Sequence, residues 1–286
     1  MKHLNLILFI FLTLLNSDWT SENVRTNIEK INVKLSEDEI AITFLDLSNG
    51  EASLIHLPNG EFYLVNTGGN GTQKELKEYL EVYEVKQLKG IIITKQDTLY
   101  TSNIDWLLQQ FSDVQIIQGA HNKQEYSKEY SNIKIVKWEN QKTYQLSSLL
   151  AAEVVHEEHD NEKSLGMDVL LRFGNHQILF MTSANSKLEH QMLSNKELPI
   201  TNILKVAEFG HEKGSGEKFV NHVNPQMAII FHKKGSLPSS DVLERLNSSW
   251  IDIYYTKQFG SVTIKCSLTD YEVFPISLKS DQPKGD

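Results

Sequence analysis

The chain has 286 residues, of which 40% are hydrophobic and 23% charged, so its composition is that of an ordinary globular protein able to bury its own core. Its net charge of −9 disfavours non-specific binding to the phosphate backbone of nucleic acids. The lone cysteine, Cys266, excludes an internal disulfide and a cysteine-ligated zinc site. We interpret it as a buried packing residue rather than a nucleophile.

The first 17 residues have the pattern of an export signal. Lys2 and His3 precede a largely apolar run at 4–15, which is shorter than a relaxed membrane span and as long as a signal-peptide core. No clear small-x-small cleavage site follows the run, so an uncleaved N-terminal anchor is an alternative, and a buried N-terminal helix is another. We expect a secreted or N-terminally anchored protein in which residues 18–38 form a linker.

The domain is predicted to span residues 39–276. In its first half, β-branched and apolar runs alternate with turn residues and with amphipathic runs. The expected strands are 40–45, 52–57, 61–65, 91–94, 114–118 and 133–136, and the expected helices are 73–83 and 104–111. Thr72 is expected to cap the first helix, and Pro58-Asn59-Gly60 to close a hairpin.

The second half has a similar alternation. The expected strands are 149–155, 167–173, 176–181, 203–206, 227–231, 250–255, 260–266 and 271–275, and the expected helices are 184–193, 216–222 and 241–246. A charged loop is expected at 156–163 and a disordered tail at 277–286. Strands followed by helices in two halves predict the α/β class, as a single-domain sandwich of two sheets with helices outside.

Four segments in the chain resemble, in order and spacing, the metallo-β-lactamase fold, and specifically the hydrolase domain of ComEC-type competence proteins. They are FLDLSNGEA at 44–52, LPNG at 57–60 with LVNTGG at 64–69, NEKSL at 161–165 with the strands up to 180, and LKVAEFGH at 204–211. The resemblance covers about residues 40–275. It implies a metallo-β-lactamase-like αββα sandwich.

The resemblance also implies a metal site whose ligands are absent here. In the family, a His-x-His-x-Asp-His loop, an aspartate and a later histidine hold one or two zinc or manganese ions, which convert water to hydroxide. The loop would follow the apolar run at 91–94. The matching positions are degenerate and hold Asn66, Lys95, Asp97, Leu99, Tyr100, Ser183, Glu208 and Phe209. We therefore expect no cofactor and no catalytic residue of the family type.

Two of the substituted residues, Asp97 and Glu208, can still coordinate a cation well. Together with His211 they are candidates for a residual cation or ligand site. Our hypothesis is that Lys95 pairs with one of these carboxylates and supplies the positive charge that the metals would have given. The alternative is a Lys95 side chain that points into solvent.

Other candidate sites have structural explanations. The run His156-Glu157-Glu158-His159-Asp160 is rich in metal ligands, but we prefer a solvated loop. Ser183 and Ser215 have no evident base beside them, so a serine nucleophile is not supported.

The sequence therefore predicts an exported, non-catalytic pseudo-hydrolase that binds an unidentified protein or small ligand. A divergent metal-dependent hydrolase acting on a phosphodiester or a related ester is the first alternative, and an accessory to DNA uptake is the second. The acidic balance argues against nucleic acid as a partner. Membrane contact is expected only through the N-terminal segment.

Overall fold

The computed structural model describes residues 30–124, 126, 133–160, 163–194 and 198–278. The predicted export segment at 1–17, much of the linker and most of the predicted tail lie outside these residues. Within the described part of the chain, no helix is both long and apolar enough to cross a membrane. The end of the predicted linker packs on the domain, since the Ile31 amide donates to the Val82 carbonyl at 3.0 Å and Val33 lies against the adjacent core.

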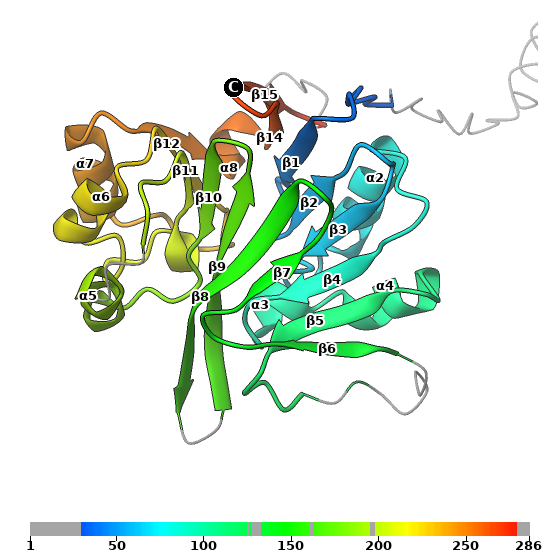
Figure 1. The fold of residues 1–286 in the computed structure, drawn as a ribbon, viewed down its shortest axis with the longest axis horizontal. Helices are drawn as coiled ribbons and strands as arrows, with labels where there is room; N and C mark the ends of the chain where they lie inside the picture. The colour runs from blue at the N-terminus through cyan, green and yellow to red at the C-terminus, as the bar shows by residue number, and fades with distance from the viewer. Residues whose placement is uncertain (1–29, 125, 127–132, 161–162, 195–197, 279–286) are drawn as a thin grey trace, which may run out of the picture.

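The described residues form two sheets packed face to face (Figure 1). Sheet A has the strand order β15-β14-β1-β2-β3-β4-β5-β6, and its β3 to β6 are parallel neighbours. Its strands are β1 (Ile40–Phe44), β2 (Ser53–His56), β3 (Phe62–Val65), β4 (Gly90–Ile93), β5 (Gln115–Gly119), β6 (Ile135–Trp138), β14 (Ser261–Cys266) and β15 (Tyr271–Ile276).

Sheet B has the order β13-β12-β11-β10-β9-β8-β7, and its β10 to β13 are parallel neighbours. Its strands are β7 (Thr143–Gln145), β8 (Leu150–Asp160), β9 (Lys163–Phe173), β10 (His176–Phe180), β11 (Ile203–Lys205), β12 (Met227–Ile230) and β13 (Asp252–Tyr255). The antiparallel strands β8 and β9 form a long hairpin that extends beyond the rest of the sheet (Figure 1).

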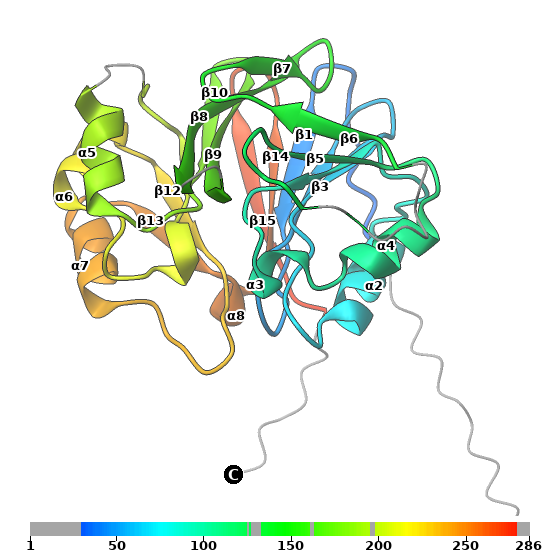
Figure 2. The same cartoon turned by 90° about the horizontal axis from the view of Figure 1, so that it is seen from below.

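Helices cover the outer face of each sheet (Figure 2). The longer helices are α2 (Gln73–Val82), α4 (Ile104–Gln110), α5 (Ser186–Ser194), α6 (Glu217–Val223) and α7 (Ser240–Ser248), and the short ones are α3 (Thr98–Thr101), the 3-10 turn η2 (Ala207–Phe209) and α8 (Thr256–Phe259). Helices α2 and α4 lie on sheet A, and α5, α6 and α7 lie on sheet B. This arrangement confirms the predicted αββα sandwich.

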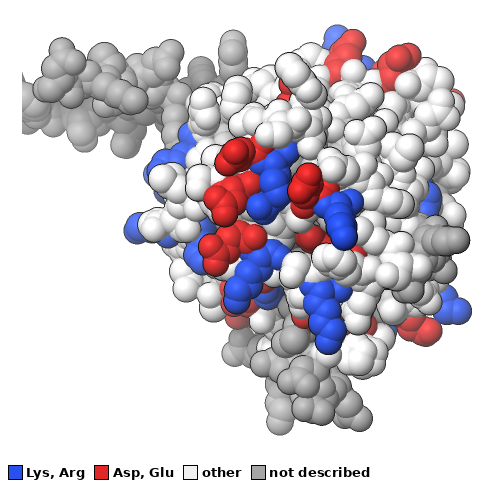
Figure 3. Space-filling view, turned by 90° about the vertical axis from the view of Figure 1, so that its left-hand side faces the viewer, with Lys and Arg blue, Asp and Glu red and all other residues white. Residues whose placement is uncertain are grey.

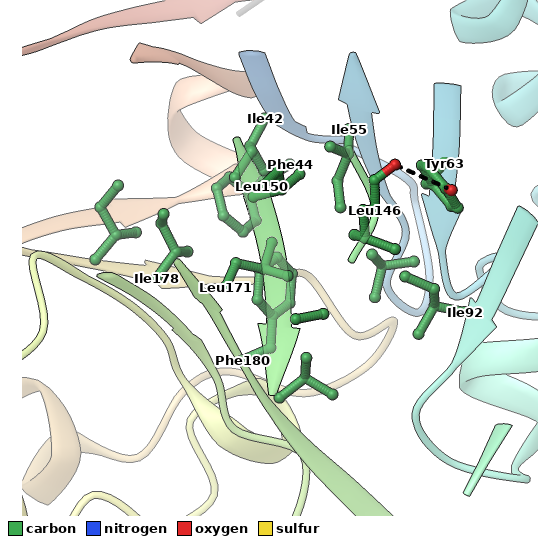
Figure 4. Close-up of a cluster of buried hydrophobic side chains, with 14 of the residues drawn as sticks. Ile42, Phe44, Ile55, Tyr63, Ile92, Leu146, Leu150, Leu171, Ile178 and Phe180 are labelled. Carbon is green, nitrogen blue, oxygen red and sulfur yellow. Dashed lines mark hydrogen bonds between the residues drawn. The ribbon is translucent and has the colours of Figure 1, made fainter. Parts of the chain in front are cut away.

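The alternation of side chains along the strands explains these layers. In β4, Ile92 joins the core between the sheets, whereas Ile91 and Ile93 pack under the helices of sheet A. A strand buried on both faces is apolar throughout, as expected for a parallel sheet. Between the sheets, Phe44 stacks on Phe180 with ring centroids 5.6 Å apart (Figure 4).

Three local predictions were wrong. Thr72 does not cap α2 with its side chain, because its hydroxyl donates instead to the Gly69 carbonyl at 2.7 Å. The run at 156–160 is the end of β8, paired with β9, and not a loop. Trp250 does not begin a strand: it follows α7 with a left-handed φ of 58° and is 93% exposed.

Candidate functional site

The candidate site lies where the parallel strands of both sheets end. Loops at the carboxyl ends of parallel strands commonly bind ligands, because these ends open onto one edge of the sheet. Here the loops are 66–72 after β3 and 94–97 after β4 in sheet A, and 181–185, 206–216 and 231–239 after β10, β11 and β12 in sheet B. The two sheets meet at this edge, since the Met167 amide donates to the Thr94 carbonyl at 2.7 Å.

A buried polar layer lies beneath the site. The Lys205 ammonium donates to both oxygens of Glu51 at 2.9 Å, and both residues are 1% exposed or less. The side-chain amide of Asn66 donates to the Glu51 carboxylate at 2.8 Å and to the Thr94 hydroxyl at 3.0 Å. Burial raises the pKa of the Glu51 carboxyl, and the Lys205 ammonium opposes that shift. The ion pair therefore joins the loop after β1 to the end of β11.

A second ion pair forms the floor of the site. The Lys95 ammonium lies 2.5 Å from Glu208, with both side chains half-buried. The same ammonium lies 6.0 Å from the centre of the Tyr100 ring, which packs against Phe209 at 5.9 Å between centroids. Tyr100 is buried, and burial together with the nearby Glu51 and Glu208 carboxylates raises its phenol pKa well above the ordinary value. The contact required by our hypothesis on Lys95 is thus present with Glu208.

Backbone strain is concentrated in the same region. Three residues here have a positive φ: Asn66 at 61°, Glu208 at 43° and Phe209 at 61°. This is the left-handed region, which residues other than glycine rarely adopt. Such residues persist only where the surrounding contacts hold them, and they cluster at functional sites. At Glu208, the strained backbone presents the carboxylate to Lys95.

Above this floor, an open cleft of about 570 Å³ is lined almost entirely by polar and charged side chains. Its lining residues are Lys95, Glu158, Ala184, Asn185, Ser186, Glu208, His211 and Lys213. They come from the loop after β4, the end of β8, the loop before α5 with the first residue of α5, and η2 with the loop after it. The cleft can therefore hold a polar ligand between the two sheets.

The remaining predicted residues have other roles. Asp97 caps α3 by accepting from the Leu99 amide at 2.9 Å. Leu99 packs against the core between the sheets. Ser183 is buried beside Asp168, whose carboxylate accepts from the Thr182 amide at 2.6 Å. Of the suggested residual cation set, the structure brings Glu208 and His211 to the cleft but uses Asp97 as a helix cap.

Sequence reasoning missed Glu51, Lys205 and Asp168 as site residues. Glu51 and Lys205 each lay inside a segment that carried the family resemblance, 44–52 and 204–211, so a search for opposite charges between those segments could have found the pair. Nothing in the sequence marked Asp168 as a site residue, because it lies within an otherwise apolar strand pattern. Its Oδ2 atom has no hydrogen-bond partner among the described residues, and His156 Nδ1 lies 3.6 Å from it.

The charged run at the end of β8 divides between two faces of the hairpin. His156 lies near Asp168, and Glu158 accepts from the Asn185 side chain at 2.9 Å. Glu157 is buried on the opposite face, where its carboxylate contacts the ring of His121 at 2.9 Å. Pairing in a strand therefore separates ligands that looked contiguous in the sequence.

The side chains at the site do not fit the family's metal centre. Lys95 and Lys205 bring two ammonium groups there, and each is paired with a carboxylate. An ammonium repels a dication, and zinc sites use imidazole, thiolate or carboxylate donors. Across the described ranges, no group of three or more His, Cys, Asp or Glu side chains is arranged to hold a metal ion.

Comparisons with known proteins agree on the fold. No protein-family model matches the chain. No curated protein matches it in sequence. Among solved structures, the metallo-β-lactamase fold protein YhfI from Bacillus subtilis is similar, with a TM-score of 0.54, 12% identity, and coverage of 80% of this chain and 100% of that chain.

Two further solved structures are similar over comparable lengths. A diphosphatase from the PhnP family has a TM-score of 0.53 and 12% identity, covering 80% of this chain and 99% of its own. Zinc-bound PqqB from Methylobacterium extorquens has a TM-score of 0.52 and 7% identity, covering 78% and 99%. At such identities the likeness concerns the fold alone. The chain therefore has the metallo-β-lactamase fold.

Proposed function

We propose that this chain is a non-catalytic protein of the metallo-β-lactamase fold, related to the ComEC-type hydrolase domains, which acts by binding a protein or small ligand in the cleft above Lys95 and Glu208. The observation that carries the proposal is the Lys95–Glu208 ion pair, 2.5 Å between its charged atoms. It lies in the loops where the resemblance expects metal ligands. A fold likeness alone does not transfer an activity, so the proposal depends on the site.

Charge balance explains how such a site persists without metals. A pocket lined by carboxylates is stable only if positive charge compensates them. Lys205 compensates Glu51 in the buried layer, and Lys95 compensates Glu208 at the floor. In this proposal the two ammonium groups take over the charge of the metals and leave the loops in place for binding.

A divergent hydrolase of phosphodiesters or related esters is the main alternative. It requires Asp97, Glu208 and His211 to converge on a cation. Asp97 accepts from the Leu99 amide, and Glu208 is paired with Lys95. No observation favours this alternative over binding.

Metal content and hydrolysis test the proposal together. The full chain is purified, incubated with zinc or manganese, dialysed, and analysed for bound metal and for hydrolysis of bis(p-nitrophenyl) phosphate. We expect no tightly bound ion at the cleft and no hydrolysis. The matched variants are Glu208→Gln and His211→Ala. One or two tightly held ions, lost together with hydrolysis in these variants, would replace the proposal with the hydrolase.

Export belongs to the same proposal, and it rests on the apolar run at 4–15. A fusion of residues 1–38 to a reporter that is active only outside the cytoplasm should be active. Replacing Leu8 by arginine within the run should abolish that activity, since the run must enter the membrane. Equal activity of both fusions would contradict export. DNA uptake is tested by a salt titration of DNA binding, for which we expect no measurable affinity at physiological salt.

A further inference from the structure

The cleft continues into a longer groove. A hollow of about 240 Å³ beside the β8–β9 hairpin shares Glu158 and Asn185 with the cleft. A hollow of about 220 Å³ beside the loop 231–239 shares Glu208 and His211 with it. The three hollows are therefore neighbours, and we call them together the polar groove. It runs from the hairpin, over the start of α5 and the Lys95–Glu208 pair, to Leu237.

The polar groove carries both signs of charge. Four lysines and four glutamates line its three hollows: Lys95, Lys187, Lys213 and Lys233, and Glu157, Glu158, Glu208 and Glu212. Over the face that Figure 3 presents, basic and acidic side chains are likewise intermixed and do not form a basic stripe. The groove is thus close to neutral although the whole chain has a net charge of −9.

This chemistry excludes several kinds of occupant. Pockets for compact organic ligands are mostly apolar and enclosed, which this open, polar groove is not. Single-stranded nucleic acid needs an excess of basic groups and aromatic platforms for its bases. The Phe209 ring, which lines one end of the groove, is only 6% exposed and offers little surface for stacking a base. A lipid surface needs an apolar or basic patch.

We propose that the polar groove binds an extended peptide segment that carries acidic and basic residues, an inference that rests on the proposed binding function and names its ligand class. An extended peptide spans about 3.3 Å per residue and offers alternating side chains together with main-chain donors and acceptors. Its charges pair with Lys213 and Glu158 along the groove. Leu237, 73% exposed at one end, gives an apolar contact for one of its side chains.

Hydrogen bonds within the protein hold one wall of the groove in place before any ligand binds. Glu189 of α5 is 2% exposed and accepts from the Ser215 and Gly216 amides at 2.6 and 2.9 Å. From α7, Arg245 donates to the Gly214 and Ser215 carbonyls at 3.1 and 2.9 Å. This double clamp holds the loop that carries His211 and Lys213 against α5. A preformed wall reduces the ordering cost of binding.

The start of α5 adds a main-chain donor to this wall. Asn185 accepts from the Lys187 and Leu188 amides at 3.0 and 3.3 Å, which caps two of the first amides of the helix. The cap leaves the amide of Ser186, which lines the cleft, outside these bonds. A peptide carbonyl in the groove is a suitable acceptor for it.

The test is selection from a displayed library of random dodecapeptides against the immobilised full chain. Selected peptides are then synthesised and their affinities measured by fluorescence anisotropy for the wild type and for Lys213→Glu. We expect enriched peptides with both charge signs, and about tenfold weaker binding to Lys213→Glu, the change that corresponds to ~1.4 kcal/mol. Lys74→Glu is the matched control, because Lys74 has the same charge and lies on α2 away from the groove. It should leave the affinity unchanged.

Exchange of the peptide's charge adds a second criterion. A peptide in which the acidic residue opposite Lys213 is replaced by lysine should bind Lys213→Glu better than it binds the wild type. Failure to enrich any peptide, equal affinities for Lys213→Glu and the wild type, or displacement of the peptide by a single-stranded oligonucleotide would each overturn the proposal. Metal-dependent hydrolysis in a chain that still binds such peptides would overturn the non-catalytic function and leave the groove intact.

Discussion

Two ion pairs lie at the same edge of the sandwich and differ chiefly in burial. The side chains of Lys205 and Glu51 are 1% and 2% exposed, whereas those of Lys95 and Glu208 are 25% and 30% exposed. Each pair joins a lysine ammonium of one half of the chain to a glutamate of the other, and Lys205 contacts both oxygens of Glu51 whereas Lys95 contacts one oxygen of Glu208. We attribute the different roles of the two pairs to this difference in burial.

A buried pair is costly to break, because each charge has lost its water and depends on its partner. A pair at the surface can exchange its partner for water or for a ligand at little cost. We conclude that the Lys205–Glu51 pair holds the two halves of the site together. The Lys95–Glu208 pair is open to the cleft and is the one that a ligand can contact.

Removing the buried ammonium should have the largest effect on stability. Lys205→Met leaves the Glu51 carboxylate buried without compensation, and we expect a loss of about 3–5 kcal/mol in the free energy of unfolding. Urea denaturation at neutral pH measures it. Adding Glu51→Gln removes the orphaned charge and should recover most of the loss. A Lys205→Met protein as stable as the wild type would show that the buried pair is not structural.

Introducing a carboxylate at position 66 tests the same buried layer. Asn66→Asp replaces an amide donor 2.8 Å from Glu51 by a second carboxylate. We expect a loss of about 1–3 kcal/mol at neutral pH from the lost hydrogen bond and the like charges. The effect should shrink when Glu51→Gln is added, and it should shrink in acid. An Asn66→Asp protein as stable as the wild type would show that the hydrogen bond from Asn66 to Glu51 does not stabilise this layer.

Acid should destabilise the protein through a half-buried histidine that belongs to neither ion pair. Burial lowers the pKa of His56, which stacks on Phe62, to about 4 from an ordinary value of 6.5. Between those values the unfolded chain binds a proton at this histidine and the folded chain does not, so stability falls as the pH falls from about 6.5 to 4. Allowing for partial exposure, we expect about 1–2 kcal/mol.

The control for this titration is His56→Gln, which cannot take up a proton in this range. Its free energy of unfolding should show a shallower dependence on pH over the same window, measured by urea denaturation at a series of pH values. An unchanged slope would assign the acid sensitivity to another group.

Breaking the exposed pair should have the smallest effect. Lys95→Met leaves Glu208 within reach of water, so we expect a loss of no more than about 1 kcal/mol. Peptide affinity should change more than stability does, because Glu208 then faces the groove unpaired. A loss as large as that of Lys205→Met would abolish the distinction between the two pairs.

Hydrophobic patterning predicted most of the fold. The run at 91–94 and the amphipathic run at 73–83 became β4 and α2, since neither depends on distant residues for its pattern. The pattern failed where a tertiary contact decides the outcome. The charged run at 156–160 looked like a loop, but pairing with β9 and burial of Glu157 against His121 make it a strand.

The candidate site was predicted in part. Charge led to the hypothesis that Lys95 pairs with Asp97 or Glu208, with a solvent-facing Lys95 as the alternative, and the structure has the contact with Glu208. Asp97 was expected to be available for coordination, but a short helix, α3, begins directly after it and uses its carboxylate as a cap. Local turn chemistry of this kind competes with function for the same oxygen atoms.

The sequence by itself determined the two-sheet class and the succession of strands and helices along the chain, because residue identity and periodicity are local properties. Only the tertiary structure decided that Lys205 meets Glu51, 154 positions away, inside the molecule, while Lys95 meets Glu208 at the surface of a cleft. The reason is physical: the strength of an ion pair depends on its exposure to water, and exposure is set by what the fold packs around it.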